Sequence, residues 1–136
     1  MAVPILRLNA RVLIVALGAD ITDEGVMEFQ DQLTERVAKM EARGVVVDVS
    51  ALDVVDSFMA RVLNDSARML RLLGAEVVVC GLQPAVAMTL VEMGSKLVDV
   101  QTSFTLERAL MLLDGLMARA DRAAAPGLPD DPAPHD

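Results

Sequence analysis

The residues that could do chemistry gather in one stretch near the middle of the chain, DVSALDVVDSFMARVLND at 48–65. Within it, Ser57 supplies a hydroxyl group and stands between Asp56 and Phe58. A serine acts as a nucleophile when a neighbouring base activates it. This stretch contains neither histidine nor lysine, and the one histidine of the chain is His135, close to its end. We therefore expect no enzymatic activity and no catalytic residue.

Three carboxylates in the same stretch raise the possibility of a metal site. Asp48, Asp53 and Asp56 surround the predicted end of a strand, and carboxylates so placed bind hard cations when their geometry agrees. Asp48 falls inside an apolar run, however, and no glycine-rich phosphate-binding loop accompanies the three. We favour solvated turn carboxylates and helix caps over a cation site, and we expect neither a metal ion nor a cofactor.

The sulfur-containing residues indicate core packing. Cys80 is the one cysteine and ends the apolar run EVVVC, so it allows no disulfide framework and favours a reducing compartment. Nothing near it in the sequence would lower its pKa, and we expect it to fill space in the core. Most of the nine methionines, Met27, Met59 and Met88 among them, recur at helical spacing and are predicted to pack inside as well.

The composition limits the function classes. The chain has 136 residues, enough for one domain, and is 54% hydrophobic with 2% aromatic residues. Its formal net charge of −8 argues against binding to nucleic acid or to anionic lipid, both of which need clustered lysine and arginine. It shows no secretory leader and no apolar run of about 18 residues that could span a membrane. We expect a cytoplasmic protein.

The order of apolar runs predicts an α/β fold that can position Ser57. Two short runs are spaced as a hairpin, and the later runs are continuous β-branched segments typical of parallel strands. Amphipathic helical periods separate them. We expect a small mixed β-sheet, an opening antiparallel hairpin followed by parallel strands, with helices on one side. The expected strands are Ile5–Leu8, Val12–Leu17, 45–49, 76–80 and 97–100.

Capping signals define the expected helices. Thr22 is a predicted N-cap, and glycines are the predicted helix stops. We expect a folded domain over 1–118, followed over 119–136 by a disordered tail rich in proline, alanine and aspartate. The expected helices are one from Thr22 to a stop at Gly44, one from about Ser57 to Leu73, one from Pro84 to Gly94, and one over 106–116.

Ser57 has two readings from the pattern alone. Either Ser57 or Asp56 is an ordinary N-cap, a common feature worth about 1 kcal/mol. Alternatively, Ser57 is a phosphorylation site, because a helix N-terminus accommodates an anion and a phosphoryl group adds about −1.5 to −2 charges at pH 7. The residue pattern favours the cap and leaves the second reading open.

Three motifs together resemble the STAS family, the anti-sigma-factor antagonist domains. They are the opening VPILRLNARVLIV, the central DSFMARVL after an acidic loop, and GLQPAVAMTLVEMG. The resemblance covers about residues 3–118. Within the family, the chain is most similar to single-domain stressosome scaffolds of the RsbS type. Many sporulation-type antagonists have Ser-Ser-Gly or Ser-Thr-Gly at this helix start, whereas Phe58 and Met59 follow Ser57 here.

The resemblance implies a non-enzymatic phospho-switch scaffold. Such proteins have a mixed sheet with helices on one side, and a partner kinase phosphorylates the serine that heads the second helix, here Ser57. The implied partners are an RsbT-like serine/threonine kinase and an RsbR-like STAS paralogue with an N-terminal sensor domain, together with self-association into a large assembly. Phosphorylation then releases the kinase.

The residues around Ser57 are the expected partner surface. Asp56, Phe58, Met59 and Arg61 are the candidates, although Phe58 and Met59 could equally be packing residues. The alternative function is a STAS binding module of another class, namely a simple anti-anti-sigma factor, a nucleotide-sensing domain or a partner in a transporter complex.

Overall fold

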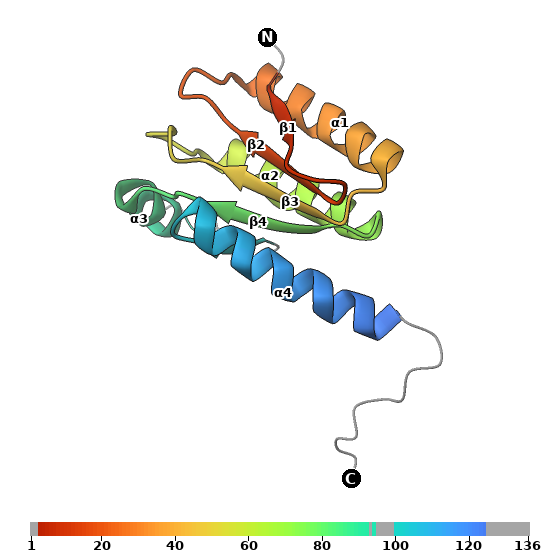
Figure 1. Cartoon of the computed structure of the whole chain (residues 1–136). Helices are drawn as coiled ribbons and strands as arrows, with labels where there is room; N and C mark the ends of the chain where they lie inside the picture. Colours follow the sequence, from red (N-terminus) through yellow and green to blue (C-terminus); the bar gives the residue numbers. More distant parts are fainter. Residues whose placement is uncertain (1–2, 93, 95–99, 125–136) are drawn as a thin grey trace.

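A five-stranded mixed β-sheet forms the centre of the computed structural model, which describes residues 3–92, 94 and 100–124 (Figure 1). The strands lie in the order β1-β2-β3-β4-β5, so neighbours in the sequence are neighbours in the sheet. The elements are β1 (Ile5–Arg7), β2 (Val12–Ala16), α1 (Asp23–Met40), β3 (Gly44–Asp48), α2 (Ser57–Leu72), β4 (Glu76–Cys80), α3 (Pro84–Glu92), β5 (Gln101–Ser103) and α4 (Leu106–Ala124).

The pairing of the strands confirms the predicted sheet. β1 pairs antiparallel with β2, with Ile5 opposite Val15, and every later pair is parallel. β3 and β4 are buried on both faces, which is why their valine runs show no alternation with polar residues. Because the carboxyl ends of parallel strands lie on the same side of a sheet, the loops that follow β2, β3 and β4 lie together at that side.

The helices cover both faces of the sheet, so the expectation of helices on one side is wrong for one of them. α1, α2 and α3 contribute to one core cluster, which includes Phe29, Leu33 and Leu70. α4 crosses the opposite face (Figure 1), where Leu113 and Met117 pack on the other side of the valine strands. The strands are apolar on both faces, and the second face needs a helix of its own to exclude water.

The end of α1 and the position of the last strand differ from the prediction. α1 ends at Met40 with Glu41 in the left-handed conformation, and Gly44, the expected helix stop, is instead the first residue of β3. The last strand lies at 101–103 rather than 97–100, where 97–99 fall outside the described residues. Pairing with β4 sets the position of this short edge strand, since Gln101 is opposite Val78.

The C-terminal helix continues beyond the expected domain boundary. α4 runs through Ala124, so the first six residues of the expected tail, 119–124, are helical. Asp121 stabilises this extension because it forms ion pairs with Arg11, at 2.9 Å, and with Arg43. The rest of the expected tail, 125–136, lies outside the described residues. None of the described helices is both long and apolar enough to span a bilayer.

Candidate functional site

Ser57 is the first residue of α2, and its side chain is exposed. Asp56 caps the helix: its backbone is extended and its Oδ1 accepts a hydrogen bond from the Met59 N–H at 2.8 Å. This settles which of the two residues is the cap, since Asp56 satisfies a backbone donor of the first turn. The Ser57 hydroxyl is therefore not needed as the N-cap.

The other predicted surface residues separate into two groups. Phe58 is 37% exposed, and Arg61, one helical turn after Ser57, is exposed as well. Met59 is only 7% exposed and belongs to the main core cluster, so its side chain does not contribute to a partner surface. The helical repeat explains the difference, because one face of α2 must pack on the sheet.

The acidic loop before α2 is held by local hydrogen bonds. Asp48 Oδ1 accepts from the Ser50 N–H at 2.9 Å, and Asp53 Oδ1 accepts from Gln83 Nε2 at 3.4 Å. Together with the cap at Asp56, each of the three carboxylates therefore has a structural contact. Within the described part of the chain, no group of three or more histidine, cysteine, aspartate and glutamate residues could hold a metal ion.

The GLQP motif packs against this loop. Gln83 Nε2 also donates to the Ser50 carbonyl at 2.9 Å and so joins the segment after β4 to the segment after β3. Gly81 has a φ of +83°, and a Cβ there would lie 2.8 Å from the Ser50 Cβ. Only glycine fits this combination of backbone angle and close approach. The motif thus supports the loop that presents Ser57.

A hollow next to Ser57 was not predicted from the sequence. It has a volume of about 420 Å³ and joins two elements, the first turns of α1 and the start of α2. Met27, expected in the core, is 41% exposed and lines it, as Phe58 does. The acidic residues at the start of α1 were visible in the sequence, but the sequence did not show that α1 lies beside Phe58. The lining residues are Asp23, Glu24, Met27, Glu28 and Phe58.

The family of this fold follows from a match to a known domain. The model of the STAS domain matches residues 4–109. The chain belongs to the STAS domain family.

Two solved structures and one curated relative show which STAS proteins this domain resembles. A serine-to-glutamate variant of RsbS from Moorella thermoacetica is 39% identical, with a TM-score of 0.74 over 86% of this chain and 97% of that one. A chain from the stressosome, described there as a signal integration and transduction hub, is also 39% identical, with a TM-score of 0.70 over 83% of this chain and 97% of that one. RsbT co-antagonist protein RsbRA of Bacillus subtilis is 26% identical over 110 residues, which is 81% of this chain and 40% of RsbRA.

The single cysteine of this STAS domain is a buried thiol of low reactivity. Cys80 lies in the second core cluster under α4 and is 1% exposed. Burial, followed by the charge of Asp48, raises the pKa of the thiol to about 11. The thiolate is the reactive form, so a buried thiol with a raised pKa is a poor nucleophile. This agrees with the expected packing role.

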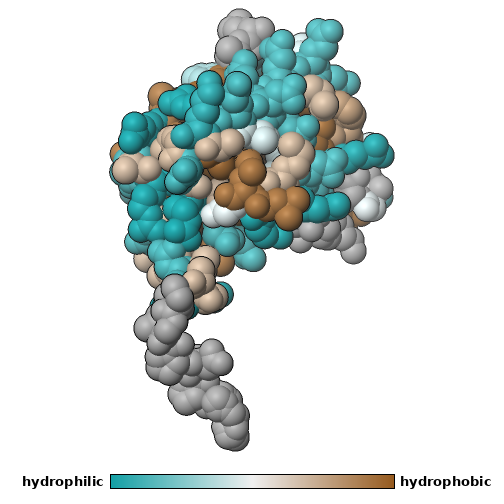
Figure 2. Space-filling model, turned by 90° about the vertical axis from the view of Figure 1, so that its right-hand side faces the viewer, coloured by the Kyte–Doolittle hydropathy of each residue, from teal (hydrophilic) through white to brown (hydrophobic). Residues whose placement is uncertain are grey.

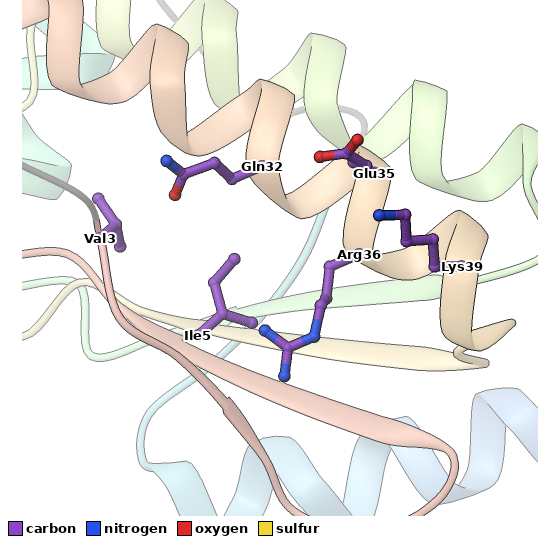
Figure 3. A pocket seen from close by; sticks show the side chains of 6 residues that line it. All are labelled: Val3, Ile5, Gln32, Glu35, Arg36 and Lys39. Atoms are coloured by element: carbon purple, nitrogen blue, oxygen red, sulfur yellow. The ribbon is translucent and has the colours of Figure 1, made fainter.

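The STAS domain has other surface features away from Ser57. A hollow of about 270 Å³ lies between β1 and the second half of α1, where Arg36 and Lys39 line it with Ile5 (Figure 3). Figure 2 views the end of the molecule where α1 and α2 finish, and a compact hydrophobic patch interrupts its hydrophilic surface there. Exposed Leu72 and Leu73 lie at this end, at the far end of α2 from Ser57.

Proposed function

We propose that this STAS domain is a phospho-switch scaffold of a cytoplasmic stressosome-like assembly, which holds an RsbT-like serine/threonine kinase until the kinase phosphorylates Ser57. The observation that carries the proposal is the exposed hydroxyl at the first position of α2, left available because Asp56 is the cap. A kinase needs its substrate hydroxyl accessible to the γ-phosphate of ATP.

Similarity to stressosome proteins supports the proposed assembly. The RsbS chain and the stressosome chain are covered almost completely by this domain, at 39% identity. The domain spans about two fifths of RsbRA, whose name makes it a co-antagonist of RsbT. We infer that the partners are an RsbT-like kinase, an RsbR-like STAS protein with a sensor domain, and further copies of this chain.

The proposed chemistry is a phosphoryl transfer carried out by the partner. The kinase moves the γ-phosphoryl group of ATP to Ser57 Oγ, and the hydroxyl proton leaves to the base of the kinase, so that ADP and phosphoserine are the products. The STAS domain provides the acceptor oxygen and the surface that the kinase binds. The new group brings about −1.5 to −2 charges at pH 7 to the start of α2.

Release follows from the change in the docking surface. Asp56, Phe58 and Arg61 flank Ser57 at the exposed start of α2. A hydrated phosphate in their midst disrupts a closely packed partner face. A loss of about 1.4–2.8 kcal/mol corresponds to roughly tenfold to a hundredfold weaker binding.

The test is incubation of the purified STAS domain with an RsbT-like kinase and ATP, followed by peptide mass mapping and binding measurements. We expect one phosphate on Ser57, none on Ser57→Ala, and stable kinase binding by Ser57→Ala. Ser57→Asp is expected to bind the kinase about tenfold to a hundredfold more weakly, whereas the neutral Ser57→Asn serves as the size-matched control.

Assembly is tested separately by size-exclusion chromatography with an RsbR-like protein. Elution of the mixture as a particle far larger than either component supports the scaffold role. A phosphate on another residue, or equal binding of the kinase to phosphorylated and unmodified protein, would refute the switch at Ser57. A mixture that runs as separate small species would refute the scaffold.

A further inference from the structure

The hollow beside Ser57 combines an exposed apolar pair with a rim of carboxylates. Met27 from α1 and Phe58 from α2 are 41% and 37% exposed, and both line the hollow. Asp23, Glu24 and Glu28 complete the lining. Phe58 directly follows Ser57 in the chain, so the hollow lies close to the residue that the kinase is proposed to modify.

The two helices that form the hollow are fixed relative to each other. Gln30 of α1 donates from Nε2 to Ser66 Oγ of α2 at 3.1 Å, and Ser66 Oγ in turn donates to the Val62 carbonyl at 2.7 Å. Ser66 is buried, so this bond is protected from water. Met27 and Phe58 therefore line the hollow from two helices whose relative position is fixed.

The segment that leads into α1 and forms its first half carries charge of one sign, whereas on α2 Arg61 is an exposed cation near Ser57. No lysine or arginine occurs between Arg11 and Arg36, whereas this stretch contains six acidic residues. Glu24 and Glu28 also line a second hollow, of about 340 Å³, near the carboxyl end of β2. These two carboxylates thus stand between two recesses. The cations of α1, Arg36 and Lys39, lie in its second half.

We propose that the hollow of Asp23, Glu24, Met27, Glu28 and Phe58 is the docking surface for the kinase, and that the kinase face it accepts carries an apolar side chain surrounded by lysine or arginine. The proposal rests on the function proposed above. The apolar pair gives the contact, and the acidic rim selects a basic partner and raises its association rate.

This surface determines how phosphorylation releases the kinase. A basic partner face is attracted, not repelled, by additional negative charge, so simple repulsion cannot separate the two proteins. A phosphate on Ser57 acts instead through its hydration and bulk, because it stands next to Phe58 and prevents a dry contact in the hollow. Release is therefore a loss of apolar contact.

The test compares charge-reversed variants in kinetic binding experiments with the RsbT-like kinase. Glu24→Lys with Glu28→Lys reverses the rim, and Glu107→Lys with Asp114→Lys makes the same change in net charge on α4, across the sheet. We expect the rim variant to lower the association rate on the order of tenfold at low salt, with the difference shrinking at high salt. The α4 variant should match the wild type.

Two further measurements separate the parts of the proposal. Met27→Ala should speed dissociation at every salt concentration, because it removes apolar contact. Raising the salt concentration should not bring the affinity of Ser57→Asp closer to that of the wild type measured at the same salt concentration, whereas a restored relative affinity would overturn the apolar mechanism of release. Circular dichroism confirms that each variant is folded.

The outcomes distinguish this inference from the function on which it rests. If the rim variant binds like the wild type while Ser57 is still phosphorylated, the docking surface is wrong and the switch stands. If the kinase neither binds the unmodified domain nor phosphorylates Ser57, the proposed function fails and this inference fails with it.

Discussion

At the scale of single residues, adjacent side chains at the start of α2 divide two tasks. Asp56 accepts the hydrogen bond that caps the helix, and Ser57 begins the helix with an exposed hydroxyl. An aspartate that caps the helix leaves the serine available for another contact. If Ser57 were itself the cap, its phosphorylation would disturb α2. The arrangement keeps the fold of the helix independent of the proposed modification.

The capping role of Asp56 gives a stability prediction. Asp56→Ala should lower the free energy of unfolding by about 1 kcal/mol, because the Met59 N–H loses its partner. Asp56→Asn should retain most of the stability, since asparagine caps about as well as aspartate. Urea denaturation checks both values, with the exposed Asp31→Ala on α1 as the control. Equal stability of Asp56→Ala and wild type would contradict the capping role.

At the scale of elements, the contact between β3 and α4 depends on Gly44, which has no side chain. A Cβ at Gly44 would lie 2.7 Å from Leu113 Cδ2 and 2.7 Å from Met117 Sδ, both on α4. The absence of a side chain at Gly44 lets α4 approach the start of β3 closely. The sequence pattern suggested a helix stop at this glycine, because a helical period precedes it. The structural reason for the glycine lies instead in a helix more than sixty positions away.

This close approach predicts the effect of adding one methyl group. Gly44→Ala should destabilise the domain by about 1–3 kcal/mol, the usual range for an overpacked core. Gly115→Ala is the matched control: a Cβ there meets nothing within 4 Å, and alanine in a helix is favoured over glycine by roughly 0.5–1 kcal/mol. Thermal denaturation of both variants checks the contrast. Two variants of equal stability would contradict the close packing of α4.

At the scale of the whole molecule, Asp121 links the C-terminal helix to two distant turns. Its carboxylate pairs with Arg11, next to the β1–β2 turn, and with Arg43, just before β3. The hydrogen bond from Arg43 is the main cause of its lowered pKa, and the bond from Arg11 adds to it. These contacts hold the last turns of α4 against the sheet, where composition alone predicted a disordered tail.

The lowered pKa of Asp121 gives a pH prediction. A carboxylate whose pKa is lower in the folded state than in the unfolded state stabilises the fold above its ordinary pKa. That contribution is lost as the pH falls through the lowered value. Asp121→Asn should therefore reduce the stability at pH 7 and narrow the difference in melting temperature between neutral and acidic pH.

The matched control for this prediction removes another carboxylate from the same helix. Asp114 is exposed on α4, so Asp114→Asn should leave the pH dependence close to that of the wild type. Melting curves recorded at pH 7 and pH 3 compare the three proteins. An Asp121→Asn curve that shifts with pH as much as the wild type does would show that the ion pairs contribute nothing to folding.

The sequence by itself determined the order of elements and the part of the site that is local. Continuous apolar runs predicted the buried strands, because burial on both faces leaves no polar alternation, and a repeat of 3.6 residues predicted the helices. The start of α2 was also predictable, since a cap acts within three residues of the chain. Asp56 and Ser57 were therefore both candidates, and only the geometry distinguished them.

Only the tertiary structure decided which distant segments meet. It placed α4 on the second face of the sheet and brought the acidic start of α1 beside Phe58. No period or cap carries this information, because the valine strands of this sheet are apolar on both faces and accept a helix on either one. The sequence pattern shows which face of each element is apolar. It does not show which two apolar faces pack together, because that depends on how their shapes fit in the folded protein.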